Sequence, residues 1–308
     1  MCKKIISVII PTHKSLSFLK RTILCLEKQK PDTFFFESIV VDDGSNDKTE
    51  VWLRRYQGSL DLKSIIFPKN KGRSAARNAG VKISTCSLLL FLDGDMEFDE
   101  YFVLNHAKSH YNDNHVTIGR VKYDLISSCR GYAKYLTGRG VMKLDSREII
   151  PGRYFLSGNS SLSRDLFDSV GGFDVGLKSY GEDIDFGVRL ESEGAQFQFN
   201  SELTVQHLHI RSLDTLFKLS REYGRVTIPE LVERYPELRK ELKLDWVQKS
   251  GITGIIRRLL LRRPFYYIAI VIVRVLNEFR APGLLYSYLI FRNYYYGYLE
   301  HTKEEANT

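Results

Sequence analysis

The chain has 308 residues, 43% of them hydrophobic and 27% charged, which is the composition of an ordinary folded protein long enough for one large domain with an appendage. Its net charge of +8 is uneven, because residues 255–299 hold seven arginines against the single acid Glu278. This distribution excludes a general nucleic-acid surface and indicates a local basic patch. With no visible signal peptide and no CxxC spacing, we expect plain thiols in a reducing, cytoplasmic setting. The cysteines are Cys2, Cys25, Cys86 and Cys129.

Strand-like and helix-like segments alternate four times in the first 92 residues. Apolar, β-branched runs predict strands at 4–10, 35–41, 62–67 and 88–92. Helical patterns begin near Ser15, after a cap at Asn46 or Asp47, and at Gly72. This alternation predicts an α/β fold with a mostly parallel central sheet and flanking helices.

Beyond residue 98 the elements follow a less regular order. Segment 127–140 fits either a helix or a loop. Helices are expected at 99–111, from about Asp165, at 182–193 and at 213–223, and strands at 116–123 and 203–209.

The segment from about Thr253 mixes arginines with aliphatic residues and eight tyrosines. Its longest uncharged apolar run, 264–273, is about half the roughly 20 residues that a membrane-spanning helix needs. We expect one or two helices, broken at 281–283, that lie on an anionic membrane surface through residues 253–299. The alternative is a helical hairpin packed on the N-terminal domain or on a second subunit.

The run LLLFLDGDME at 88–97 is the most informative stretch, because an apolar strand ends there in Asp93-Gly94-Asp95. In open α/β sheets the ligand crevice lies at the carboxyl ends of the strands. Two neighbouring carboxylates repel unless a cation lies between them, and hard divalent ions combine carboxylates with substrate phosphates. The pattern predicts a metal–diphosphate site, whereas a simple Asp-Gly surface turn is the alternative.

Two further segments offer contacts for a nucleotide. Asp42 and Asp43 end the second strand, where a carboxylate can accept hydrogen bonds from uracil, guanine or a ribose; otherwise they only begin the next helix. The loop that includes Asn70 opens a basic helix with Arg73 and Arg77, which either approach a diphosphate or form a solvated helix face.

The second half of the chain supplies candidates for a base and for a metal ligand. Asp183 is our candidate general base, with Glu182 as a contact to the acceptor and Asp185 as a capping or pairing residue. These acids also suit a helix start without any catalytic role. His207 is a candidate third metal ligand, and His209 a weaker one, although single histidines are usually structural.

Six segments, in order and spacing, resemble the family 2 glycosyltransferases of the GT-A fold over residues 5 to 225. They are SVIIPTHKSLSFLKRTILCL, IVVDDGSNDKT, NKGRSAARNAGV, LLLFLDGDMEF, GNSSLSRDLFDSVGGFD and GEDIDFGVRL. The resemblance implies an inverting, metal-dependent transfer from a nucleotide sugar. It places Pro11, Thr12, Asp42 or Asp43, Asn70, Arg77, Asp93 and Gly94 around the nucleotide, Gly158, Asn159 and Glu182 beside the sugar or acceptor, Asp183 as base, and Asp95 and His207 on the metal. His13 departs from the family pattern, and no QxxRW signature of processive synthases is present.

These inferences predict a catalytic domain at 1–225 and a helical extension at 226–308. The expected reaction uses a UDP-sugar, Mn²⁺ or Mg²⁺, and a hydroxyl of a glycan or lipid-linked glycan in surface polysaccharide synthesis. The expected location is the cytoplasm, peripheral to the inner face of the membrane, and the tyrosine-rich end is an alternative surface for a homo-oligomer. The competing hypotheses are a nucleotidyltransferase, although its Gly-rich loop is missing after the first strand, and an inactive binding module.

Overall fold

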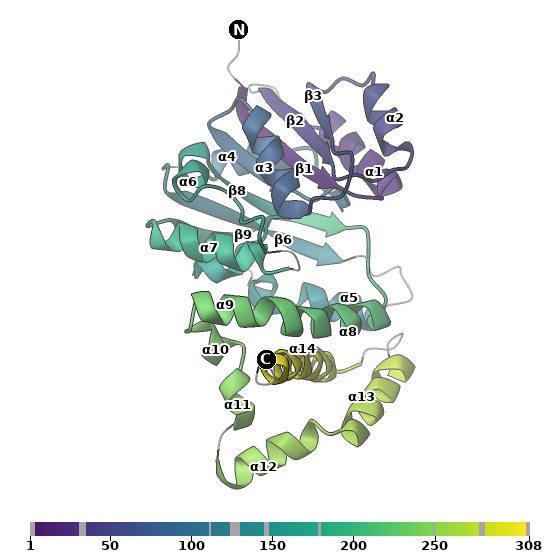
Figure 1. Cartoon of the computed structure of the whole chain (residues 1–308). Helices are drawn as coiled ribbons and strands as arrows, with labels where there is room; N and C mark the ends of the chain where they lie inside the picture. The colour runs from purple at the N-terminus through teal and green to yellow at the C-terminus, as the bar shows by residue number, and fades with distance from the viewer. Residues whose placement is uncertain are drawn as a thin grey trace. The chain divides into compact units, whose positions relative to one another are not determined.

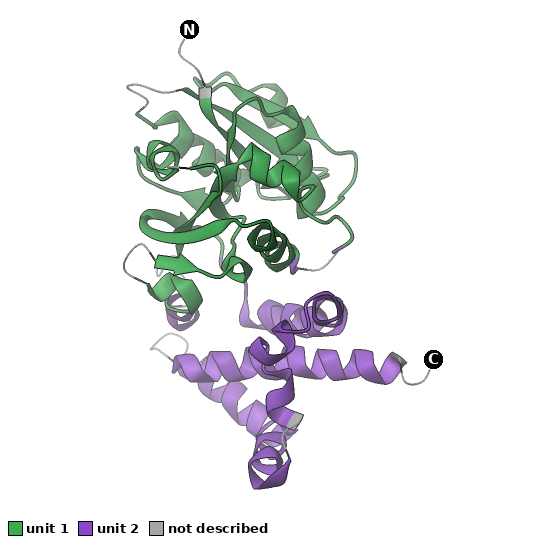
Figure 2. Ribbon diagram, turned by 90° about the vertical axis from the view of Figure 1, so that its left-hand side faces the viewer, with its two compact units in different colours: residues 1–124, 137–176, 182–209 green, residues 125–136, 177–181, 210–308 purple. Residues whose placement is uncertain are grey.

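The computed structural model describes residues 4–30, 35–110, 112–123, 130–144, 148–177, 180–248, 250–276 and 281–305, which form two compact units (Figure 2). Unit 1 comprises residues 1–124, 137–176 and 182–209, and unit 2 comprises residues 125–136, 177–181 and 210–308. The main division after residue 209 lies earlier than the boundary at 225 expected from the sequence. Cys2, Cys129, Glu278 and Arg280 lie outside the described residues.

The described part of unit 1 is built around a nine-stranded sheet in the order β3-β2-β1-β4-β8-β6-β9-β5, with β7 paired to β9 (Figure 1). Its strands are β1 (Lys4–Thr12), β2 (Phe35–Asp42), β3 (Leu62–Ile66), β4 (Leu88–Leu92), β5 (Met96–Glu97), β6 (His115–Tyr123), β7 (Glu148–Ile150), β8 (Asn159–Ser163) and β9 (Gln196–His207). The first four strands pair in parallel, as predicted. β8 then runs antiparallel to β4 and β6, and β6 runs parallel to β9.

Helices flank this sheet (Figure 1), and their apolar side chains form one buried core with those of the strands. On α1, Leu19, Ile23 and Leu26 recur with helical spacing and are buried against the sheet. Asp47 caps α2 by accepting a hydrogen bond from the Thr49 amide, one of the two caps predicted. The helical elements of unit 1 are α1 (Leu16–Glu27), α2 (Lys48–Arg54), α3 (Arg73–Ile83), α4 (Phe102–Lys108), α6 (Arg164–Ser169), α7 (Glu182–Ser192), and the short 3-10 turns η1 (Gly140–Lys143) and η2 (Gly152–Tyr154). This architecture confirms the predicted α/β class.

Unit 2 is helical, and its long last helix packs against α8 and the π-turn η3. Two glycines make this close approach possible: a Cβ on Gly224 would lie 1.9 Å from the Tyr294 carbonyl oxygen, and one on Gly297 would lie 2.1 Å from that of Arg221. The elements of unit 2 are α5 (Arg130–Thr137), α8 (Leu213–Glu222), η3 (Tyr223–Thr227), α9 (Ile228–Arg234), α10 (Leu238–Glu241), α11 (Leu244–Gln248), α12 (Gly251–Leu260), α13 (Arg263–Leu276) and α14 (Gly283–Glu305).

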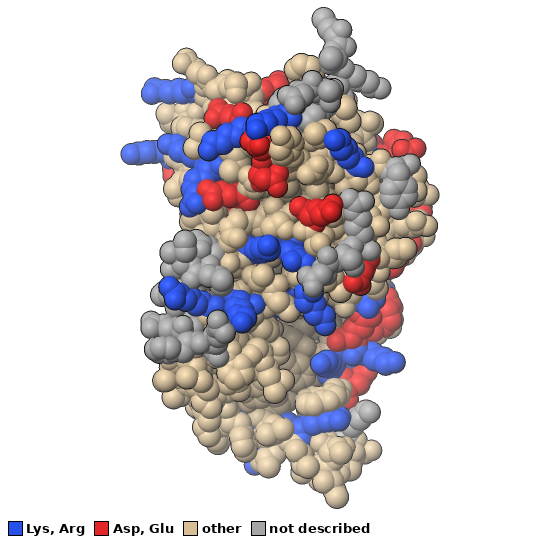
Figure 3. Space-filling model, turned by 180° about the vertical axis from the view of Figure 1, so that it is seen from behind, with Lys and Arg blue, Asp and Glu red and all other residues tan. Residues whose placement is uncertain are grey.

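The outer face of α12 and α13 is apolar, although it is exposed. On α13, Ala269 and Val273 face inward, while Ile268, Val271 and Val275 are each more than half exposed. Figure 3 shows a broad tan area at the lower left of the molecule, with Lys or Arg side chains only at its edges. The described helices include none that is both long enough and apolar enough to cross a bilayer.

Not all arginines of the basic segment lie on the surface. Arg292 is buried, donates to the Leu261 carbonyl oxygen at 2.8 Å, and lies between the rings of Tyr266 and Tyr296. Its guanidinium therefore organises the interior of unit 2. Arginines that stay exposed next to the apolar face are Arg258, Arg262, Arg263 and Arg274.

Candidate active site

The carboxyl ends of β1, β2 and β4 meet at one rim of the sheet. Thr12 pairs with Asp42 at the ends of β1 and β2, and β4 pairs with β1 on the other side. Asp93-Gly94-Asp95 follows β4 directly at this rim. A Cβ on Gly94 would lie only 3.3 Å from the Pro11 carbonyl oxygen, so the loop passes close to the end of β1. This is the position at which open α/β sheets bind ligands.

Asp95 and His207 are neighbours, although 112 positions separate them in the chain. The short strand β5 pairs Met96 with His207, and the Leu208 amide donates to the Asp95 carbonyl oxygen at 2.9 Å. The Asp95 Oδ2 atom lies 3.7 Å from His207 Nε2. The His207 ring stacks on Tyr123 with ring centroids 4.9 Å apart, which fixes its orientation.

The Asp95–His207 pair has the donor types that suit a manganese- or magnesium-like ion. Among the residues that the structure describes, no three His, Cys, Asp or Glu side chains form a preassembled metal cage. Two protein ligands suffice where substrate phosphates and water complete the shell, as is usual for Mg²⁺. His207 Nδ1 accepts a hydrogen bond from the His209 amide at 3.2 Å, so coordination through Nε2 requires the ring proton to move to Nδ1 and this bond to break.

Arg77 connects the rim to helix α7. Its side chain is 1% exposed, and its Nη2 lies 2.9 Å from Asp93 Oδ1, while Nη1 lies 3.5 Å from Glu182 Oε1. Arg73 reaches the same Glu182 oxygen at 3.0 Å from one turn earlier on α3. The buried guanidinium thus holds two carboxylates from distant segments in one cluster.

These charges set the ionisation of Asp93. Burial alone raises the pKa of a carboxyl, but the positive charges of Arg77 and Arg73 outweigh burial and bring the pKa of Asp93 below its usual range. The main-chain amide of Asp93 donates to the Gly158 carbonyl oxygen at 3.2 Å. A Cβ on Gly158 would lie 2.7 Å from Asp93 Oδ2, so only glycine lets this carboxylate lie against the β8 turn.

Asp183, beside Glu182 at the start of α7, has the opposite behaviour. Burial and the neighbouring charge of Glu182 raise the pKa of Asp183 to about 6, against the opposing charge of Arg77. Its Oδ2 accepts a hydrogen bond from the Ser157 amide at 3.3 Å. Its Oδ1 is buried without a hydrogen-bond partner among the described residues, and so is the Ser157 hydroxyl. A carboxylate oxygen in this state is available to a hydroxyl group of a ligand.

Residues 7–178 of this chain, more than half of its length, match the model of the family described as "Glycosyl transferase family 2". The chain belongs to glycosyl transferase family 2. This membership makes the protein a transferase and speaks against the nucleotidyltransferase and binding-module alternatives.

Relatives of this glycosyltransferase differ in the activities that their names state. The uncharacterized glycosyltransferase YfnE of Bacillus subtilis is 25% identical, with 76% of this chain and 71% of YfnE covered. The chondroitin synthase of Pasteurella multocida is 27% identical, with 77% of this chain covered. The match spans only 28% of that protein. Validoxylamine A glucosyltransferase of Streptomyces hygroscopicus is 25% identical, with 81% of this chain and 65% of the relative covered.

Two solved structures share the fold. The mannosyltransferase PcManGT of Pyrobaculum calidifontis, in complex with GDP-Man and Mn²⁺, has a TM-score of 0.65 at 14% identity, covering 96% of this chain and 86% of that one. TarS 1-349 of S. aureus, in complex with UDP-GlcNAc, has a TM-score of 0.54 at 19% identity, covering 97% and 92%. At such identities the likeness shows the GT-A fold alone.

The acids predicted to contact the nucleotide are already hydrogen-bonded within the glycosyltransferase. Asp42 is 1% exposed, and its Oδ1 accepts from the Ser45 amide at 3.1 Å. Asp43 accepts from the amides of Lys71 and Gly72 at 2.6 and 3.0 Å, and thereby fixes the basic loop before α3. Asn70 lies exposed on this loop. The structure thus gives Asp42 and Asp43 a role in shaping the rim.

The residues predicted beside the sugar also differ in their placement. Asn159 is 0% exposed, donates to the carbonyl oxygens of Arg120 and Leu203, and pairs with His106 Nε2 at 3.0 Å, so its side chain is used inside the fold. Glu182 is buried under the two arginines of α3. Asp185 pairs with Arg189, as the sequence indicated, and exposed His209 lies against Phe18.

Two residues of the site were missed by sequence analysis. Ser157 supplies the amide that holds Asp183, and Tyr123 supplies the ring beneath His207. Tyr123 and His207 are register partners on β6 and β9, and this pairing leaves no signal in the local sequence.

Proposed function

We propose that this family 2 enzyme is an inverting, metal-dependent glycosyltransferase that moves a sugar from a UDP-sugar to a hydroxyl of a glycan or lipid-linked glycan. The observation that carries the proposal is the clustering, at one rim, of the Asp95–His207 pair with the Asp93–Arg77–Glu182 network and Asp183. The chondroitin synthases among its relatives support a polysaccharide-type acceptor.

The nucleotide diphosphate is assigned to the rim between β1, β2 and β4. Pro11 and Thr12 line one side of it, and the loop of Asn70, fixed by Asp43, lines another. Asp95 and His207 would hold the divalent ion, which supplies neutralisation of the charge that develops on the leaving diphosphate. Mn²⁺ in the complexes of fold neighbours supports this cofactor.

Asp183 is assigned as the general base. Its buried Oδ1 accepts the proton of the acceptor hydroxyl while that oxygen attacks the anomeric carbon from the face opposite the diphosphate, so the configuration inverts. A pKa near 6 leaves the carboxylate ionised at neutral pH but still basic enough to take a proton. Arg77 and Ser157 position this group and Glu182 without touching the reacting atoms.

The exposed apolar face of α12 and α13 supports a peripheral location on an anionic membrane. Its exposed arginines, Arg258, Arg262 and Arg263, would lie at the phosphate level while Ile268 and Val271 enter the acyl region. The catalytic chemistry belongs to the N-terminal part of the chain and membrane contact to the C-terminal helices.

A thermal-shift screen of UDP, GDP and their sugars, with and without Mn²⁺, tests the donor and the cofactor together. We expect UDP to raise the melting temperature most, and only with the metal present, because a ligand that binds the native state stabilises it by mass action. Asp95→Asn should lose the metal-dependent part of the shift and metal-dependent donor hydrolysis. A shift with GDP alone, or one independent of metal, would contradict the donor or the cofactor assignment. The anomeric configuration of the product, read by NMR, tests inversion.

A further inference from the structure

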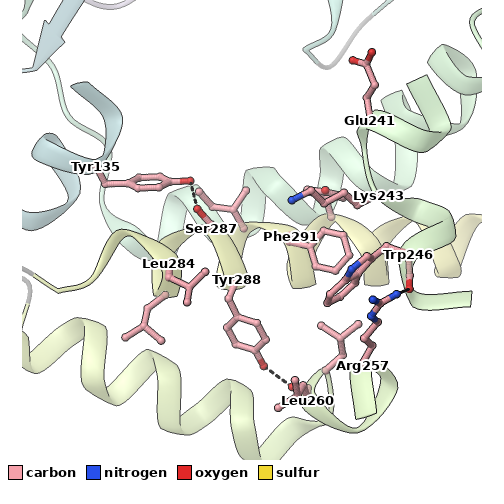
Figure 4. A pocket seen from close by; sticks show the side chains of 14 residues that line it. Tyr135, Glu241, Lys243, Trp246, Arg257, Leu260, Leu284, Ser287, Tyr288 and Phe291 are labelled. Atoms are coloured by element: carbon pink, nitrogen blue, oxygen red, sulfur yellow. Dashed lines mark hydrogen bonds between the residues drawn. The ribbon is translucent and has the colours of Figure 1, made fainter. Parts of the chain in front are cut away.

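Unit 2 contains an apolar cavity of about 570 Å³ among α12, α14 and the chain around α10 and α11 (Figure 4). This volume lies within the range of about 300–1,000 Å³ of small-ligand sites. Its walls are leucine, isoleucine and aromatic side chains, and every lining residue belongs to unit 2. The lining residues include Trp246, Leu260, Leu284, Tyr288 and Phe291.

The hydroxyl groups of Tyr288 and Ser287 and one guanidinium nitrogen of Arg257 are bonded to the protein. Tyr288 donates its hydroxyl to the Leu260 carbonyl oxygen at 2.8 Å, and the Ser287 hydroxyl donates to that of Tyr135 at 3.1 Å. Arg257 donates to the Trp246 carbonyl oxygen at 2.9 Å and covers the indole ring. A ligand that needs several hydrogen bonds gains little here, whereas a hydrocarbon chain meets only carbon surface and paired groups.

The cavity opens beside the exposed apolar side chains of α12. Leu260 and Leu284 line it and are also 43% and 80% exposed, so this part of its edge is apolar. The lining carries two cations, Lys243 and Arg257, against one acid, Glu241, whose carboxylate points away from the other lining groups in Figure 4. An apolar interior with a cationic edge matches an amphiphile that has a hydrocarbon chain and an anionic head.

We propose that this cavity binds one acyl chain of an anionic phospholipid, with the phosphate held by Lys243 and Arg257. The chain withdrawn from the bilayer anchors unit 2 more firmly than adsorption of α12 and α13 alone. The inference deepens the membrane part of the proposed function. It is tested without a membrane or sugar transfer, so its failure leaves the transferase assignment standing.

Trp246 gives a local reporter, because the chain has only two tryptophans. In a Trp52→Phe background, we expect monomeric 12-bromododecyl phosphate to quench Trp246 with a saturable 1:1 curve. Across alkyl phosphates of increasing length, affinity should rise about threefold to fourfold per methylene until the cavity is full, and then level off. Quenching that never saturates, or affinity without a plateau, would overturn the proposal.

Two cavity-filling variants test the location. Ser287→Phe and Leu284→Phe place a ring in the cavity from exposed positions, and either should weaken the probe at least tenfold. Val271→Ser, on the outer face, should leave monomer binding unchanged. Wild-type affinity in both folded phenylalanine variants would refute the cavity as the site.

The anionic head has its own test. Dodecanol should bind more weakly than dodecyl phosphate, and Lys243→Gln should reduce that preference by about fivefold or more. Equal binding of the alcohol and the phosphate would overturn the part of the proposal that assigns Lys243 and Arg257 to the phosphate.

Discussion

The rim of the sheet in unit 1 buries charged groups, which proteins usually expose. The outer face of α12–α13 in unit 2 exposes apolar side chains, which proteins usually bury. At the rim, charge is buried: Arg77 is 1% exposed and lies between Asp93 and Glu182. On α12–α13, apolar surface is exposed: Ile252 is 76% exposed and Val275 is 65% exposed. Buried charge is costly unless the chain supplies partners, and exposed apolar surface is costly unless something outside the chain covers it. The charge of Arg77 is therefore paired within the protein, whereas we expect the apolar face to be covered by a partner from outside the chain.

The largest expected effect is the loss of activity when the candidate base is removed from the rim. Asp183→Asn keeps the shape of the side chain but cannot take a proton, so we expect kcat to fall by about 10²–10⁴-fold while the donor Kd changes less than about threefold. Below pH about 6 the wild-type rate should fall about tenfold per pH unit, as the carboxyl group protonates. Steady-state kinetics and calorimetry with UDP check this. Asp165→Asn, at the second position of α6 where the side chain is exposed, is the matched control. Near-normal turnover of Asp183→Asn would contradict the assignment.

Removing the buried cation tests whether Arg77 stabilises the fold through its two carboxylate partners. Arg77→Met leaves Asp93 and Glu182 without their shared partner, and we expect the free energy of unfolding to fall by about 3 kcal/mol. Urea unfolding measures the loss. In Arg54→Met the lost pair with Glu50 is largely exposed, so this control should change stability by less than about 1 kcal/mol. Equal effects of the two variants would show that burial of Arg77 does not matter.

Variants of α13 test whether a membrane covers the exposed apolar face. Ile268→Ser and Val271→Ser remove exposed apolar side chains, so each should weaken adsorption to phosphatidylglycerol vesicles by about tenfold without lowering the melting temperature. Vesicle sedimentation measures the binding. Val51→Ser removes a side chain of similar exposure from α2 in unit 1 and should have no effect. Unchanged adsorption of both α13 variants would show that membranes do not cover this face.

A smaller effect is expected on the pH dependence of stability, from two buried histidines away from the rim. His106 bonds to Ser161 and Asn159, and burial lowers the pKa of His106 to about 4 and that of His110 to about 3. Unfolded histidines take up protons below pH 6.5, whereas these stay neutral, so stability is full above pH 6.5 and falls as the pH drops towards 4.

The loss should reach up to about 1.4 kcal/mol per pH unit for each histidine. Urea unfolding between pH 7 and pH 5 measures it, and His106→Gln should have the shallower dependence. Exposed His209→Gln should follow the wild type. If His106→Gln has the wild-type slope, the buried imidazole does not control acid stability.

Features that depend on residues close together in the chain could be predicted from the sequence. The strands at 4–10, 35–41, 62–67 and 88–92 were predictable because a local apolar run is enough to define a buried strand. The Asp47 cap depends on a bond within two residues. The placement of Asp93 and Asp95 at the rim follows from strand polarity alone.

Residues whose role depends on distant partners were not predictable in this way. Arg77 resembles a solvated helix residue in sequence, and its burial depends on Asp93 and Glu182, 16 and 105 positions away. Asn159 lies next to a glycine in a family motif, yet its amide bonds to Arg120, Leu203 and His106 from three other segments. Antiparallel β8 and the register of β9 likewise have no local signature.

The pairing of Met96 with His207 has a consequence for synthesis of the chain. Asp95 leaves the ribosome early, but its imidazole neighbour arrives only with the last residue of β9, and β5 has no other strand partner in the described sheet. A nascent chain that ends before His207 contains the loop of Asp95 but lacks the histidine that lies beside it. The Asp95–His207 pair is therefore completed only when the last residues of unit 1 have been synthesised.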